Sequence, residues 1–172
     1  MEKIMKENGF LQEKTQFMGN VLLGCLFISL CSCIKIPMYP VSFTLHTFAI
    51  SMIALKFTPK QAFASVLCYL ACGSLGLPVF SGLANPLWIM GKCGGYYIGF
   101  LVAAFLMAKA YQKLSAIAAL CIGHAIILFF GFLWLIPFVG VKIALFKGLL
   151  IFIPSDIIKI LAVSGVLKSR NL

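Results

Sequence analysis

Acidic residues are nearly absent from this chain of 172 residues, in which four Asp and Glu stand against 14 Lys and Arg. Glu2, Glu7 and Glu13 lie in the N-terminal leader, so Asp156 is the only acid in the rest of the sequence. Charged residues make up 10% of the chain and hydrophobic residues 62%. Soluble domains carry about 25% charged residues. The scarcity of charge excludes a soluble domain and predicts an all-α membrane protein.

Motifs for nucleotide hydrolysis are also missing. No G-x-x-x-x-G-K-[ST] loop occurs, because the pair Gly91 and Lys92 lacks the upstream glycine and the following Ser or Thr. If transport here uses ATP, another subunit hydrolyses it. Metal-dependent phosphoryl transfer needs several carboxylates around Mg²⁺, and Ser-His-Asp chemistry needs a dry triad. One acid and two scattered histidines do not supply such a site, so the sequence predicts neither an enzyme nor a cofactor.

Cysteines and basic residues have ordinary interpretations. Seven cysteines lie mostly in apolar runs, and neither the 31/33 pair nor the 68/72 pair has a histidine at zinc-finger spacing. We therefore interpret them as small packing residues and expect no metal site. The lysines lie at the ends of apolar runs, a pattern of membrane topology, so no nucleic-acid partner is expected.

The apolar runs predict a bundle of six transmembrane helices, since one span needs about 20 residues. The expected spans are residues 17–34, 43–55, 61–75, 94–108, 116–136 and 154–167. Residues 1–16 form a polar cytoplasmic segment, residues 17–168 the transmembrane domain and residues 169–172 a cytoplasmic tail. The Gly- and Pro-rich loop 76–93, between helices 3 and 4, is apolar and should be buried, because irregular backbone at membrane depth needs protein cover.

Basic residues set the expected orientation. With the N-terminus inside, nine Lys and Arg fall in inner segments and four in outer ones. This places both termini in the cytoplasm, and it gathers loop 76–93, the start of the second span and Asp156 near the outer face.

Asp156 and Lys159 form the candidate site. They are three residues apart on one helical face, and an ionisable residue inside the membrane is a functional hypothesis by default. The alternative is that they only neutralise each other. A carboxylate accepts hydrogen bonds and an ammonium donates them, so together they suit a ligand with N–H donors and an anionic end.

Four further residues are candidates for ligand contact: His46, Asn85, Lys92 and Tyr96. His46 starts the second span and could instead be a satisfied packing residue. Asn85 and Lys92 could gate the cavity from the long loop or face solvent. Tyr96, with the aromatic residues at 80, 88 and 97, could wall a pocket, although interface anchoring is an alternative for the tryptophan at 88. His124 is expected to form a helix–helix hydrogen bond.

Four sequence blocks resemble the BioY family, the biotin-binding S components of energy-coupling factor (ECF) transporters. Residues 40–49 read PVSFTLHTFA, similar to the family's PVPITLQTFA, and residues 73–82 read GSLGLPVFSG, similar to GALGLPVFAG. Residues 91–96 read GKCGGY, against GPTGGY, and residues 152–159 read FIPSDIIK, which matches its P-F-x-P-G-D-x-x-K block. The blocks fall in family order across about residues 17–168.

The resemblance implies a six-helix S component that captures biotin outside the cell, in the bacterial cytoplasmic membrane. Partners implied are biotin, membrane lipid, a transmembrane coupling subunit and a pair of ATPases. Some members are proposed to work without those subunits, alone or as a homo-oligomer. Carried over residue by residue, the ligand contacts become Asp156 and Lys159, with Asn85 and Lys92 from the loop.

The chain departs from the family pattern at Lys92, Cys93, His46 and Ser155, where Pro, Thr, Gln and Gly are usual. These changes leave open an S component for another small vitamin or a biotin precursor. A small membrane enzyme or a pore-forming protein is a more distant alternative, and a pore predicts no saturable ligand.

Overall fold

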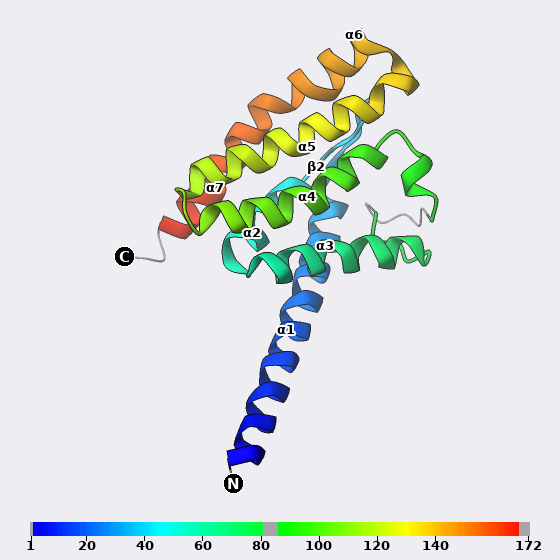
Figure 1. The fold of residues 1–172 in the computed structure, drawn as a ribbon. Coiled ribbons are helices and arrows are strands. Elements are labelled where there is room, and N and C mark those ends of the chain that lie inside the picture. The colour runs from blue at the N-terminus through cyan, green and yellow to red at the C-terminus, as the bar shows by residue number, and fades with distance from the viewer. Residues whose placement is uncertain (1, 81–85, 169–172) are drawn as a thin grey trace.

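The computed structural model describes the backbone of residues 2–80 and 86–168, and the side chains of residues 11–80 and 86–166. Asn85 and the predicted tail 169–172 lie outside the described residues. The chain is mostly helical (Figure 1). Its helices are α1 (Glu2–Cys33), α2 (His46–Lys56), α3 (Pro59–Ser74), η1 (Trp88–Met90), α4 (Gly94–Tyr111), α5 (Ala116–Val139), α6 (Val141–Ile143), η2 (Ala144–Leu149), η3 (Leu150–Phe152) and α7 (Ile153–Lys168). A two-residue antiparallel hairpin, β1 (Lys35–Ile36) and β2 (Phe43–Thr44), joins α1 to α2.

Among the described residues, four helical segments are long and apolar enough to cross a bilayer: Leu11–Cys33, Gly94–Tyr111, Ala116–Val139 and Val141–Val166. The chain is therefore an all-α, multi-pass membrane protein. Helices also form at the second and third expected spans, but α2 has 11 residues and α3 has 16. A perpendicular span needs about 20 residues, so length alone does not make these two helices spans.

Two segments differ from the sequence-based expectation. The helix α1 begins at Glu2, so the polar leader continues into the first span as one helix, and Figure 1 shows its N-terminal half projecting from the other helices. The expected connection before Pro154 is helical from Val141 onward, so that prediction was wrong. Pro154 cannot donate a backbone hydrogen bond and its ring clashes with the preceding turn. The chain accommodates the proline with a π turn (η2) and a 3₁₀ turn (η3) instead of a loop.

Local sequence explains where α3 starts and where α5 starts and ends. Thr58 Oγ1 accepts a hydrogen bond from the Gln61 backbone N–H at 3.3 Å, and the Gln61 side chain accepts one from the Thr58 backbone N–H at 3.1 Å. This reciprocal capping box, followed by Pro59, sets the start of α3. The Ser115 side chain caps α5 by accepting a hydrogen bond from the Ala118 backbone N–H. Gly140 ends α5 with a φ of +80°.

Glycines let α4 and α5 approach closely, side by side in Figure 1. A Cβ added at Gly95 of α4 would overlap Trp134 of α5, and one added at Gly131 of α5 would overlap the ring of Tyr96. Helix association in lipid depends on van der Waals contact, which small residues at the interface increase. This close pairing fixes the position of Tyr96 beside α5.

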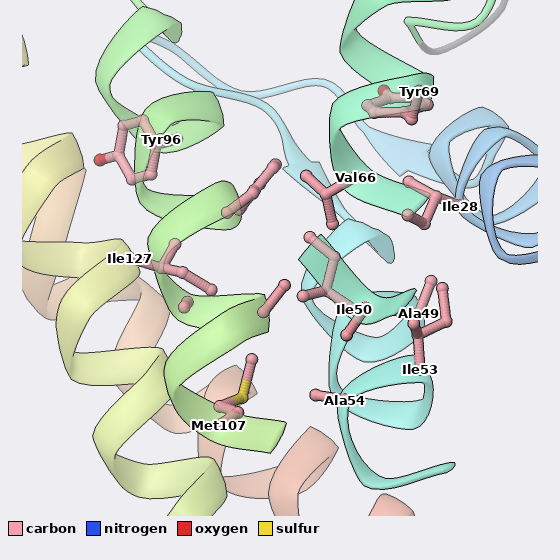
Figure 2. Packing of buried hydrophobic residues seen from close by; sticks show 14 of the residues in the cluster. Ile28, Ala49, Ile50, Ile53, Ala54, Val66, Tyr69, Tyr96, Met107 and Ile127 are labelled. Atoms are coloured by element: carbon pink, nitrogen blue, oxygen red, sulfur yellow. The ribbon is translucent and has the colours of Figure 1, made fainter. Parts of the chain in front are cut away.

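The helix α2 packs at the centre of the core. Its buried residues Ala49, Ile50, Ile53 and Ala54 face neighbours on three helices: Ile28 (α1), Val66 and Tyr69 (α3), and Met107 (α4) (Figure 2). A short helix is thus held by apolar contact on several sides. The two polar residues at the start of α2, His46 and Thr47, are thereby fixed next to the bundle interior.

In loop 76–93, the side chain of Phe80 is buried against other parts of the protein. Phe80 is 4% exposed and packs on Tyr69 and Tyr97, with ring centroids 5.3 and 4.9 Å away. By contrast, Leu77 is 49% exposed and Met90 71%. The prediction of a buried loop is right at Phe80 and wrong at these two residues, while Val79 and Trp88 are partly buried against the core.

Candidate functional site: a polar cavity at the start of the last helix

A cavity of about 350 Å³ lies where the β1–β2 hairpin, α2, α4, α5 and α7 meet. This volume is in the range of small-molecule sites, which is about 300–1,000 Å³. Its lining comprises Lys35, Val41, Ser42, Thr44, His46, Thr47, Phe80, Cys93, Tyr96, Tyr97, Phe100, Ile127, Leu128, Phe152, Asp156 and Lys159.

The structure brings together four of the six predicted site residues, since Asp156, Lys159, His46 and Tyr96 all line this cavity. Lys92 is not part of the lining. Its Nζ lies 3.4 Å from the hydroxyl of Tyr39 and 4.5 Å from the centre of that ring. Asn85 lies outside the described residues. The role of each residue in binding stays a prediction.

Asp156 lies in the first turn of α7 and is 5% exposed. Its carboxylate has a basic neighbour at each oxygen. Oδ1 lies 3.5 Å from Lys159 Nζ, and Oδ2 lies 3.2 Å from Nδ1 of His124 on α5. A buried charge of this kind persists only when it is paired.

Lys159 connects α7 to the hairpin and to α2. Its ammonium donates to the Thr44 carbonyl at 3.1 Å and to the Thr47 hydroxyl at 2.8 Å, and it lies 4.5 Å from the centre of the Phe43 ring. With Asp156, this gives an acceptor for each of its three N–H donors. Sequence reasoning missed the two threonines because they lie more than a hundred residues earlier in the chain.

His46 is both a lining residue and a satisfied packing residue. Its Nδ1 lies 2.7 Å from the Thr44 hydroxyl and its Nε2 lies 2.6 Å from the Tyr69 hydroxyl. The ring also stacks on Phe100 at 5.6 Å. Because both nitrogens have protein partners, His46 presents mainly a ring face to the cavity.

Aromatic rings form the apolar wall. Tyr97 packs on Phe80 and Phe100, with centroid distances of 4.9 and 5.6 Å. Tyr96 donates its hydroxyl to the Gly148 carbonyl, so its ring is the part left for the cavity. The prediction that the residues at 80, 96 and 97 wall a pocket is confirmed, whereas Trp88 packs behind Tyr97 and is not part of the lining.

The charged groups of the lining are two lysines and one aspartate, an excess of one positive charge. The second cation, Lys35 on β1, was not singled out by sequence reasoning. Burial raises the pKa of the neighbouring Cys93 thiol above its usual value, although Lys92 lowers it, so Cys93 is neutral at pH 7. The cavity therefore offers an acceptor, a positive field and aromatic surface.

Away from the cavity, the sulfur atoms of Cys25, Cys68 and Cys72 lie within 4.8 Å of one another between α1 and α3. Thiols at this spacing could hold a soft metal ion. None of the three lines the cavity. Their interpretation as packing residues stays a prediction.

The fold and this cavity define the class: an α-helical membrane protein that encloses a small-molecule site between its helices. Residues 5–171 match the BioY family. The chain is 36% identical over 150 residues to a "Probable biotin transporter BioY" of Rickettsia prowazekii, covering 84% of this chain and 77% of that one. It is 37% identical over 143 residues to the protein of that name in Pyrococcus horikoshii, covering 81% and 88%. The chain belongs to the BioY family.

A solved structure has the same fold. The S-component for biotin from an ECF-type ABC transporter superposes with a TM-score of 0.80 at 26% sequence identity, and the match covers 94% of each chain.

Proposed function

We propose that this protein is the S component of an ECF-type transporter and that it captures biotin in the cavity at Asp156. One observation carries this proposal. Asp156, the only acid after residue 13, is paired with Lys159 in the wall of an aromatic-lined cavity. Relatives that carry the name biotin transporter, and the S-component for biotin, support the choice of ligand.

Biotin fits the chemistry of the lining group by group. Its ureido ring offers two N–H donors, which the Asp156 carboxylate accepts. Its thiophane ring requires apolar contact, which Tyr97, Phe100 and the other rings supply. Its carboxylate is attracted by the excess positive charge of Lys159 and Lys35. Lys159 contributes charge and holds Asp156 in place, because its N–H donors already have protein acceptors.

The topology of the proposed transporter has six spans with both termini in the cytoplasm of a bacterium, and the cavity near the outer face. The hairpin and α2 then cover the cavity, and Lys92 precedes the lining residue Cys93. A ligand contact from Asn85 stays a prediction. A transmembrane coupling subunit and a pair of ATPases would release biotin inside. The chain itself carries no Walker A loop, so if transport uses ATP, another subunit hydrolyses it.

Equilibrium binding of biotin to the detergent-purified protein tests the proposal, with Asp156→Asn as the site variant. Glu13→Gln is the matched control, because it makes the same chemical change on the exposed face of α1. We expect saturable one-to-one binding that Asp156→Asn weakens at least about tenfold, the effect of losing a hydrogen bond to a charge. Glu13→Gln should bind as the wild type does. A folded wild type that binds no biotin would refute the proposal, and screening of other vitamins and biotin precursors would follow.

A further inference from the structure

His124 lies behind Asp156, on the side away from the cavity. It is 3% exposed and is not among the lining residues. Its Nδ1 is 3.2 Å from Asp156 Oδ2, and its Nε2 is 3.1 Å from the hydroxyl of Ser51. The three side chains come from α7, α5 and α2, so a polar chain crosses the bundle directly beneath the proposed ligand contact.

The chemistry of the partners decides where the proton on His124 lies. A carboxylate only accepts hydrogen bonds, so the nitrogen that faces Asp156 must carry the proton. In a neutral imidazole the other nitrogen is then an acceptor, and the Ser51 hydroxyl, which is fully buried, is the donor that it meets. Asp156 therefore selects this tautomer, and Ser51 supports it by donating to Nε2.

The contact between His124 and Asp156 is close but poorly aligned. Although the atoms are 3.2 Å apart, Nδ1 has no hydrogen bond of good geometry among the described residues. A buried donor left in this way destabilises the structure by about 1–3 kcal/mol. Turning of the Asp156 carboxylate would satisfy it, and a ligand N–H that engages the cavity side of the same carboxylate could hold that turned position.

We propose that His124 is a positioning residue for the ligand site, which orients the Asp156 carboxylate while the carboxylate accepts from the ligand. This rests on the proposed capture of biotin at Asp156. His124 touches no ligand itself. It acts through the carboxylate, in the way that a buried partner orients a metal-binding or catalytic side chain.

Two substitutions of His124 test the role. His124→Leu removes the donor, whereas His124→Asn keeps an N–H near the place of Nδ1. We expect His124→Leu to raise the dissociation constant of biotin at least about tenfold, and His124→Asn to restore it to within about threefold of the wild type. Ser51→Ala should weaken binding about threefold, and Ser65→Ala is its matched control. Ser65 is also fully buried, but its hydroxyl donates to a carbonyl of its own helix.

A double-mutant cycle separates positioning from a general structural role. If His124 acts through Asp156, then His124→Leu should change biotin affinity by less than about twofold in the Asp156→Asn background. Independent, multiplying effects would overturn the inference, as would wild-type affinity in His124→Leu. Should His124→Leu fail to fold, the pair Ser51→Ala and Ser65→Ala decides, and equal affinities would also overturn it. A folded wild type that binds no biotin refutes the proposed function instead, so the two failures are distinct.

Discussion

Replacing Lys159 by Met keeps an unbranched side chain, one heavy atom shorter, and removes its charge. The substitution leaves Asp156, which is 5% exposed, without the ammonium 3.5 Å away, and it leaves the Thr44 carbonyl and the Thr47 hydroxyl without their donor. Breaking a buried ion pair by removing one partner costs about 3–5 kcal/mol. We expect the free energy of unfolding of Lys159→Met to fall by at least about 3 kcal/mol.

The double variant Asp156→Asn/Lys159→Met should recover part of this loss. Removing both charges leaves no unpaired charge in the bundle, so its free energy of unfolding should exceed that of Lys159→Met. Biotin binding should stay at least about tenfold weaker than in the wild type, because the double variant lacks the carboxylate. Unfolding in mixed detergent and SDS micelles, followed by tryptophan fluorescence, measures stability, and calorimetry measures binding. A double variant whose loss of stability equals the sum of the single losses would refute the argument that the two charges are coupled.

Three further substitutions probe the scaffold and the mouth of the cavity. Gly95→Ala should lower the unfolding free energy by about 1–3 kcal/mol, because its methyl group overlaps Trp134, while Gly19→Ala, with open space around it, should be neutral or stabilising by up to about 1 kcal/mol in the same assay. Tyr69→Phe removes the hydroxyl that meets a buried histidine nitrogen, so the free energy of unfolding should fall by about 1 kcal/mol or more, and an unchanged value would contradict the hydrogen bond at 2.6 Å. Lys92→Ala should change biotin affinity by less than about threefold, since a partly exposed lysine outside the lining contributes about 1 kcal/mol at most, and a larger loss in calorimetry would place Lys92 in the ligand site.

Several parts of the fold follow from local sequence. The capping box at Thr58 and the glycine at position 140 mark helix ends that depend on neighbours within a few residues. The helical connection that precedes the last helix did not follow in this way. Pro154 predicts the start of α7 at Ile153, yet helical turns already begin at Val141, because π and 3₁₀ turns can precede a proline.

The candidate site also has residues that the sequence predicted and residues that it did not. The scarcity of acids singled out Asp156, and helical spacing added Lys159, so the centre of the cavity could be found from the sequence. The partners Thr47, Ser51 and His124 could not, since their contacts join helices that are far apart in the chain. Sequence analysis expected His124 to bridge two helices, and that is confirmed by Ser51, but its proximity to Asp156 was missed.

The sequence by itself determined the class of protein, the apolar segments and the one carboxylate that the membrane interior holds, because each of these depends on composition or on spacing within one helix. Only the tertiary structure decided what that carboxylate contacts. Glycine contacts bring α4 against α5, apolar packing fixes α2 between its neighbours, and together they place an ammonium and an imidazole at the two oxygens of Asp156. Such distances depend on how helices pack in three dimensions, and no pattern within a single segment encodes them.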